Sequence, residues 1–347
     1  MKQKIGYILV ETTVRKTIRD IQEDPERSIR NLVDMALTFA EGRFQQQLFE
    51  TVGSLLSRQD SAYYTLVKDV VNSVHTNRLV TFGMNLGYNG CTWGAGTIRS
   101  IEAAEGFNIP WCLSLEIDPD SFAGHLAAYK ALIYRGQDLG IYTWQLHTPS
   151  VPPQLMTLIT SCPDSAFVLF CPPHAITDDL LTRGEACPNL MFVCEYESSS
   201  HQECGEACKA LRAGGFLYGL HLIYQAGDEA RIGKEDFLAK LTGLHPVFVF
   251  LSPDELLTTE ERRRVYSLIN ELRFCQNYPL LFLELFWDNQ AIDSIISQEG
   301  CSGGFRANGS LYTLSKKSVL PDTNCFNQDL KAILKRAFPK EKKEDPI

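Results

Sequence analysis

The sequence lacks any hydrophobic run long enough to cross a membrane. Near its start, "MKQKIGYILVETTVRKTIRD" offers only the apolar stretch from Ile5 to Val10, far short of the ~18 residues that a membrane-spanning helix needs. The same segment has no small-residue cleavage site of the kind that ends a secretory signal. We therefore expect a cytoplasmic protein with no membrane partner.

The chain also lacks an excess of positive charge. It carries 33 lysines and arginines against 42 aspartates and glutamates, a net charge of -9. The basic residues of the final "KRAFPKEKKEDPI" form a short stretch that is mixed in sign. Because a phosphate backbone is attracted by a basic surface, this balance argues against nucleic acid as a partner.

Cysteine, by contrast, is plentiful. The 11 cysteines are odd in number and scattered from Cys91 to Cys325. In a chain with no export signal, such scatter argues against a disulfide framework. Most of them are expected to be reduced thiols that pack as small hydrophobic side chains.

The first third of the chain has helical periodicity. Asp24 followed by Pro25 is typical of a helix start, and amphipathic spacing continues to Val74. Residues 1–76 are therefore predicted to be a helical cap. Residues 77–110 include "TFGMNLGYNGCTWGAG", interpreted as a connecting loop with unusual backbone angles at its glycines. Tyr88 and Trp93 either cover the mouth of the barrel predicted below or pack the cap against that barrel.

From Trp111 onward the pattern changes to short apolar runs separated by helix-length polar segments. Such runs are typical of parallel strands buried on both faces and joined by helices. We predict an α/β fold, a partial or complete parallel (β/α) barrel over 111–300. A short extension over 301–330 and a charged tail over 331–347 follow. The runs are "WCLSLEI", "IYTWQLH", "AFVLFC", "LMFVCE", "FLYGLHLIY", "VFVFL" and "LLFLELF".

Polar side chains follow several of these runs. In a parallel barrel they would gather at the carboxyl ends of the strands, called the mouth below, where barrel enzymes place their chemistry. The candidates for a ligand-binding mouth are Glu116, Asp118, His147, Cys171, His174, Glu195, Tyr224 and Trp287.

Two groups of residues could hold a metal ion. Imidazoles and carboxylates at the mouth suit a divalent ion that activates water, although strand ends are polar in any barrel and the spacing is not diagnostic. These candidates are His147, His174, Glu116 and Glu195. Separately, His201, Cys204 and Cys208 would share one helical face, where Cys204 and Cys208 with Ala207 and Leu211 equally form a packing stripe.

Several segments resemble the radical S-adenosylmethionine (radical SAM) proteins. The likeness covers nearly the whole chain and is to a bacterial branch with a helical N-terminal region and a C-terminal iron–sulfur, SPASM-like region. It implies a barrel of the radical SAM type. The matching segments are "ALTFAEGRFQQQLFE", "FNIPWCLSLEIDP", "YRGQDLGIYTWQLH", "CPDSAFVLF", "TTEERRRVYSLINELRFCQNYPLLFLELFWDN" and "GCSGGFRANGSLY".

The sequence departs from that family where its chemistry resides. Relatives hold a [4Fe-4S] cluster by a Cys-x3-Cys-x2-Cys loop after the first strand, whereas "DPDSFAGHLAAYKA" has no cysteine and is about a dozen residues shorter. The family's Gly-Gly-Glu-Pro segment is replaced by "LHTPSVPP", and its Thr-Asn-Gly turn by "CPPH". Only Cys301 and Cys325 remain of the auxiliary-cluster region. Loss of both the cluster and S-adenosylmethionine is therefore expected.

The leading hypothesis is a non-catalytic protein that binds a peptide or small molecule, or that pairs with an active radical SAM relative. One alternative is a metal-dependent barrel enzyme with a new site at the mouth. Another is a radical SAM enzyme whose cluster is assembled from Cys112, Cys171 and Cys194.

Overall fold

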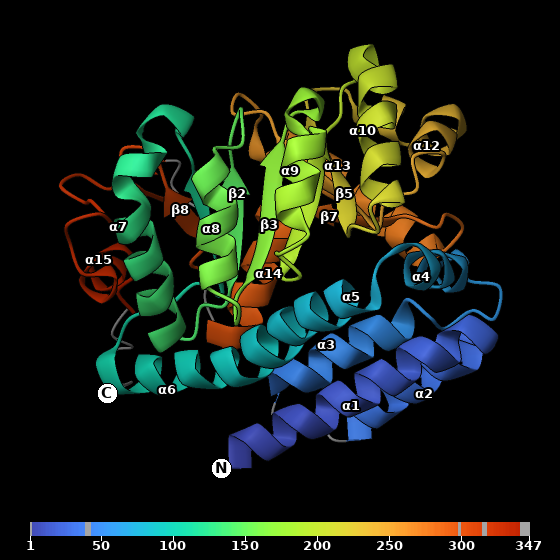
Figure 1. Ribbon diagram of the computed structural model, residues 1–347, viewed down its shortest axis with the longest axis horizontal. Helices are drawn as coiled ribbons and strands as arrows, with labels where there is room; N and C mark the ends of the chain where they lie inside the picture. The colour runs from blue at the N-terminus through green and yellow to red at the C-terminus, as the bar shows by residue number, and fades with distance from the viewer. Residues whose placement is uncertain (1, 39–42, 298–299, 314–317, 341–347) are drawn as a thin grey trace.

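A curled sheet forms the centre of the protein. The computed structural model describes residues 2–38, 43–297, 300–313 and 318–340. Helices cover the outer face of the sheet, and the N-terminal helices lie across one end (Figure 1). The prediction of an α/β protein with a partial barrel is confirmed. Within the expected segments, residues 39–42 and 341–347 lie outside the described residues.

Strands form at all seven predicted runs. Consecutive strands pair in parallel, so the sheet runs in chain order from β1 to β7. The C-terminal extension adds β8 parallel to β1, and then β9 and β10 antiparallel. Among the described residues the order is β10-β9-β8-β1-β2-β3-β4-β5-β6-β7. The strands are β1 (Cys112–Glu116), β2 (Thr143–His147), β3 (Ala166–Cys171), β4 (Leu190–Glu195), β5 (Tyr218–Tyr224), β6 (Phe248–Pro253), β7 (Leu281–Glu284), β8 (Gly303–Phe305), β9 (Leu311–Thr313) and β10 (Ser318–Val319).

The outer face of the sheet packs against the helices that connect the strands. Side chains such as Leu113, Trp144 and Phe192 join helix residues in the main hydrophobic core. This explains why the strand sequences are almost continuously apolar. The helices are α7 (Pro119–Asp138), α8 (Pro153–Ser161), α9 (Asp178–Gly184), α10 (His201–Ala213), α11 (Glu229–Ile232), α12 (Glu235–Thr242), α13 (Thr259–Cys275), α14 (Leu285–Ser297) and α15 (Leu330–Ala337), with the short turns η2 (Pro173–Ala175) and η3 (Ser198–Ser200).

The N-terminal helices fill the inner, concave face of the sheet at the end opposite the mouth. Val74 and Phe82 pack there with Val168, Met191 and other inward strand residues. A separate core holds most of these helices together, whereas Ala95 and Ile98 of the last one join the main hydrophobic core. The helices are α1 (Lys2–Glu23), α2 (Pro25–Thr38), α3 (Arg43–Ser54), α4 (Ala62–Ser73), α5 (Thr76–Gly83), the π-helix η1 (Met84–Gly94) and α6 (Ala95–Glu105).

The segment expected to be a glycine-rich loop is helical instead. In η1 the glycines adopt helical backbone angles, and Gly94 has φ -60°. A Cβ on Gly94 would lie 2.3 Å from the carbonyl oxygen of Gly140, so glycine permits close backbone approach rather than an unusual turn. Tyr88 packs edge-on against Tyr7 with ring centroids 5.4 Å apart. Tyr88 thus packs within the helical region, while Trp93 is 44% exposed.

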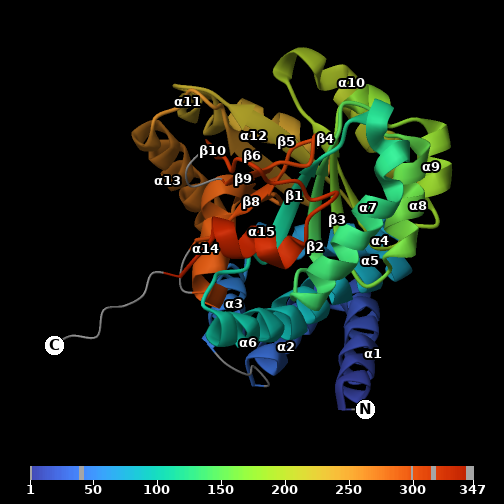
Figure 2. The ribbon, with the colours of Figure 1, turned by 90° about the vertical axis from the view of Figure 1, so that its left-hand side faces the viewer.

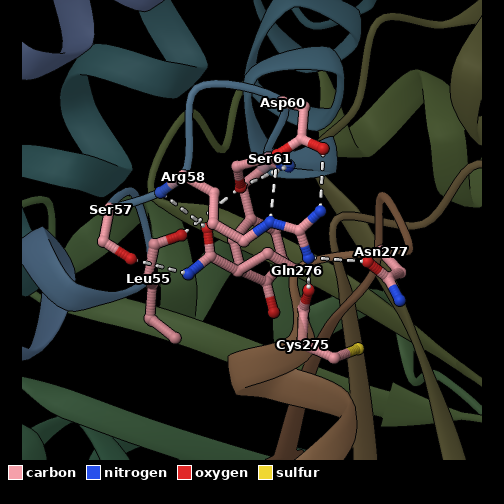
Figure 3. A network of polar contacts seen from close by, with 9 residues as sticks. Leu55, Ser57, Arg58, Asp60, Ser61, Cys275, Gln276 and Asn277 are labelled. Atoms are coloured by element: carbon pink, nitrogen blue, oxygen red, sulfur yellow. Dashed lines mark hydrogen bonds and ion pairs between the residues drawn. The ribbon is translucent and has the colours of Figure 1, made fainter.

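A polar junction ties the N-terminal helices to the end of α13 (Figure 3). Gln276 ends α13 in the left-handed conformation, φ 56°, and its amide donates to the carbonyl of Ser54 at 3.0 Å and to the Ser57 hydroxyl at 3.1 Å. The Arg58 guanidinium donates to the carbonyl of Cys275 at 2.6 Å. Because Gln276 is buried, these bonds fix how the helical region docks on the barrel.

The helix α14 links the two edges of the parallel sheet. It follows β7 directly, and its Asp293 accepts hydrogen bonds from the backbone nitrogen of Trp111 at 3.1 Å and from the Ser302 hydroxyl. Trp111 precedes β1 and Ser302 precedes β8, so one buried carboxylate holds both strands. Figure 2 shows α14 beside α6, and α15 packs against α7. The residues of α15 were expected in a charged tail, but burial of Leu330, Ile333 and Leu334 makes them a helix.

Among the described residues, no helix combines the length and apolar character needed to cross a bilayer.

Gly136 gives a direct test of the packing between α7 and the sheet. A Cβ at Gly136 would lie 2.4 Å from Cζ2 of Trp144, whose fully buried ring has no room to move. We predict that Gly136→Ala lowers the free energy of unfolding in urea by ~2 kcal/mol or more. Gly124→Ala in the same helix, where the new methyl meets nothing within 4 Å, should raise it by ~0.5 kcal/mol or more. Equal effects from the two changes would contradict this packing.

Candidate functional site

Strand register brings several polar side chains to the mouth end of the concave face. Glu116 pairs with His147, which pairs with Phe170. Glu195 pairs with His221 on the neighbouring strand. Because partners at the same level of a parallel sheet point to the same face, these residues form one wall. Phe170 faces the inner cluster, so the wall is the inner one.

An ion pair stands at one side of this wall. Nη1 of Arg306 lies 2.5 Å from Oε1 of Glu116. Arg306 follows β8, and its guanidinium also lies over the ring of Tyr312, 4.6 Å from the centroid. Burial raises the pKa of Tyr312 to about 12. The C-terminal extension therefore supplies a cation to a site that otherwise belongs to the barrel.

Two histidines occupy the centre of the wall. His147 stacks on Phe170 with ring centroids 4.3 Å apart, and His221 meets the same ring edge-on at 5.2 Å. Nε2 of His221 lies 2.9 Å from the hydroxyl of Ser252. Its buried Nδ1 has no hydrogen-bond partner among the described residues. An unsatisfied buried ring nitrogen is costly, and it marks a position where a bound polar group would gain a hydrogen bond.

Burial keeps both imidazoles neutral near neutral pH. Desolvation lowers the pKa of His147 to about 4. Desolvation, with a smaller contribution from the neighbouring His147, lowers the pKa of His221 to about 3. A neutral imidazole can donate one hydrogen bond and accept another. The wall thus offers two uncharged donor–acceptor groups next to an ion pair.

The inner wall continues toward the helical region with Ser114 and Gln145. The hydroxyl of Ser114 donates to the side-chain oxygen of Gln145 at 2.9 Å. Beyond these residues the concave face becomes apolar and is filled by the N-terminal helices. At the other end the wall is open, since Ile223 is 59% exposed. The polar wall therefore lies between the helix-covered part of the concave face and the exposed end of the strands.

Two of the expected mouth residues face the opposite side of the sheet. Cys171 and Tyr224 are fully buried in the outer core, where the Tyr224 hydroxyl donates to Oε1 of Glu284 at 2.9 Å. The expectation that they line the mouth is corrected, because strand residues alternate between faces and Phe170, next to Cys171, points inward.

The other candidates lie around the rim. His174 sits in η2 and is exposed, and Glu195 is exposed at the end of β4. Burial raises the pKa of Glu195, with Glu197 adding to the effect and His174 opposing it. Asp118 caps α7, and Trp287 is half-buried in the first turn of α14 beside Tyr266.

The proposed metal ligands fall into two separate pairs. Glu116 and His147 lie together at one side of Phe170, whereas Glu195 and His174 lie on the rim beyond it. Within the described ranges, no group of three or more histidine, cysteine, aspartate or glutamate side chains is arranged to hold a metal ion. The sequence expectation of one four-residue metal set thus has no matching geometry.

The three cysteines considered for a non-standard cluster are divided between the faces of the sheet. Cys171 and Cys194 belong to the outer core, while Cys112, two positions before the inward Ser114 on β1, shares the inner face with it. Burial raises the pKa of both Cys112 and Cys171. Alternation along parallel strands keeps these sulfurs from one common centre.

The connection from β1 to α7 is two residues long. β1 ends at Glu116, and α7 begins at Pro119, capped by Asp118, whose carboxylate accepts from the backbone of Asp120 at 3.4 Å and from the Ser121 hydroxyl at 2.6 Å. Next to it, a cavity of about 410 Å³ lies between α7 and the C-terminal extension. It is lined by Asp118, Ser121, His125, Ala307, Asn308, Asn324 and Phe326.

Sequence reasoning missed three residues of the wall. His221 lies within the apolar run "FLYGLHLIY", where a single polar residue at an inward position was the available signal. Ser252 directly follows the run "VFVFL", and its inward position could not be read from the sequence. Arg306 could not be placed, because nothing in the sequence pattern shows that β8 returns to pair with β1.

Comparison with models of known protein families finds no match. Comparison with curated protein sequences also finds no match.

The buried imidazoles predict a loss of stability in acid. Above the ordinary histidine pKa of ~6.5, both states are neutral; below it, only the unfolded chain takes up the proton until the folded pKa of about 4 or 3 is reached. Each imidazole should therefore lower the free energy of unfolding by up to ~2 kcal/mol between pH 7 and pH 5. His221→Phe should remove its share of this loss, as measured by urea unfolding at each pH.

The exposed His174 serves as the matched control for that experiment. We expect His174→Gln to keep the wild-type difference between pH 7 and pH 5. A His221→Phe variant with the same difference as the wild type would contradict the burial of His221.

Proposed function

We propose that this chain is a cluster-less relative of the radical SAM proteins that binds a small molecule at its mouth without catalysing a reaction. The sequence resemblance and the partial parallel barrel support the relationship. The observation that carries the functional part is the β1–α7 junction: only Ile117 and Asp118 separate strand from helix. In the resembling family this connection carries the three cluster cysteines, and two residues that cap a helix leave no place for them.

The wall of the mouth supports binding of a small zwitterion, such as an amino acid or a peptide end. Glu116 and Arg306 offer opposite charges side by side, and their side chains are 33% and 41% exposed, so a ligand can reach both. Their hydrogen bond joins Nη1 of Arg306 to Oε1 of Glu116. The remaining oxygen and nitrogen can pair with the ammonium and carboxylate groups of a ligand.

The neutral imidazoles suit the rest of such a ligand. His221 offers its unpartnered Nδ1, and Phe170 with His147 forms an aromatic surface next to it. Because both rings stay uncharged, they contribute hydrogen bonds and apolar contact without adding to the charge of the ion pair. The open rim would let a partner protein, such as an active relative, take over the bound molecule.

Binding of free amino acids and dipeptides tests this proposal. Isothermal titration with a panel of L-amino acids and dipeptides should give at least one saturable ligand. Glu116→Gln and Arg306→Met should each weaken its binding at least tenfold, because each removes one charge that the zwitterion needs. Glu197→Gln removes a charge from an exposed residue after β4, at the same end of the sheet as Glu116. It should leave affinity unchanged. Absence of any saturable zwitterion, or equal affinity in all variants, would contradict the proposal.

A further inference from the structure

Three cysteines meet behind the sheet, on the face opposite the mouth. Cys194 lies on β4, and Cys204 and Cys208 lie on α10, with all three side chains buried. The sulfur atoms of Cys194 and Cys204 are 3.4 Å apart. Cys204 and Cys208, with Ala207 and Leu211, are the buried face of α10, so the sequence expectation of a packing stripe is confirmed. The stripe places two thiols against a third that the sequence pattern did not connect to them.

The surroundings favour the thiolate of Cys204 over those of its neighbours. Hydrogen bonds from Cys194 and Cys208 lower the pKa of Cys204, and burial opposes this effect. The same contact raises the pKa of Cys194. Cys204 also lies in the first turns of α10, where the helix dipole favours a negative charge. One sulfur of the group is thus prepared to act as a nucleophile, and another sulfur is within reach of it.

We propose that Cys194 and Cys204 form a disulfide that reversibly fastens α10 to the end of β4. Their sulfurs need to approach from 3.4 Å to the ~2.05 Å of a disulfide bond. The bond would close the connection over residues 195–200, which carries Glu195 at the rim of the mouth. Oxidation on the outer face of the sheet would then restrict the 195–200 connection at the rim of the mouth.

The reaction balances with oxidised glutathione as the oxidant. The Cys204 thiolate attacks one glutathione sulfur, and the second glutathione leaves as a thiolate. Cys194 then loses its proton and attacks the sulfur of Cys204 in the mixed disulfide, which releases the remaining glutathione. Two protein thiols are oxidised to one disulfide, while one oxidised glutathione is reduced to two thiols. Glutathione thiol in excess reverses both steps.

Access to the buried sulfurs comes from opening of the connection before α10. Glu197, Ser198 and Ser199 are exposed, and the turn η3 is short. Such segments open locally far more readily than the core. Oxidation is therefore expected to be slower than for an exposed thiol pair, but to occur in the folded protein.

Mass spectrometry of the folded, full-length protein tests this proposal. After incubation with oxidised glutathione, free thiols should fall from the 11 cysteines by two, and alkylated, non-reduced digests should contain one major bond. Cleavage after Glu195 and Glu203 places Cys194 and Cys204 on separate peptides, and fragmentation of the linked pair distinguishes Cys194 from Cys187, which shares its peptide. The melting temperature should rise by ~4 °C and return after dithiothreitol.

Four variants make the assignment specific. Cys194→Ser and Cys204→Ser should each abolish the bond and the rise in melting temperature. Cys208→Ser and Cys171→Ser should keep both, and Cys171 is the matched control because it is equally buried and pairs in register with Cys194. The proposal is overturned if the wild-type protein keeps all its thiols, retains glutathione as a mixed disulfide, or forms its bond between other cysteines. Those results are read from the wild-type chain and do not depend on whether a variant folds.

Discussion

The junction between β1 and α7 is the constraint on which the rest of the mouth depends. Asp118 caps the helix directly after the strand, with Pro119 in its first turn, so the backbone turns from sheet to helix without a loop. This close turn holds Glu116 at the rim in register with His147. It also leaves the space beside α7 to the C-terminal extension, which returns as β8 and brings Arg306 to Glu116. Charge at the mouth thus follows from the two-residue connection between β1 and α7.

The outer face of the sheet carries the main hydrophobic core, and the inner face carries the wall of candidate site residues. The outer face is mostly apolar, with the buried Tyr224–Glu284 hydrogen bond as an exception, and is covered by helices. The inner face is apolar only where the N-terminal helices fill it, and it becomes polar beyond Phe170. A barrel interior without this filling would expose apolar strand residues to water. The helical region therefore covers and stabilises the apolar part of the inner face.

Much of the fold could be predicted from the sequence, because parallel strands buried on both faces produce recognisable apolar runs. All seven runs became strands. Helical periodicity located α2 to α4, whereas α1 lay inside the predicted helical cap without being assigned as a helix of its own. The glycines of η1 suggested a loop, although Gly94 serves only close packing. Glycine alone does not distinguish a turn from a close approach of two backbones.

The site was harder to predict, because it depends on which face each strand residue occupies. The expected residues Glu116 and His147 lie on the wall, but Cys171 and Tyr224 lie one position off, on the outer face. Continuous apolar runs hide this alternation, so the face of a polar residue at a strand end is not visible in the sequence. The contribution of Arg306 depends on long-range strand pairing that no local pattern records.

The central claim is that this barrel has no iron–sulfur chemistry at its mouth, and anaerobic reconstitution measures it most directly. The full-length protein is incubated with iron, sulfide and reductant, desalted, and analysed for iron, sulfide and cleavage of S-adenosylmethionine. The account predicts substoichiometric iron and sulfide and no cleavage. Four irons and four sulfides per chain, with S-adenosylmethionine cleaved on reduction, would contradict it.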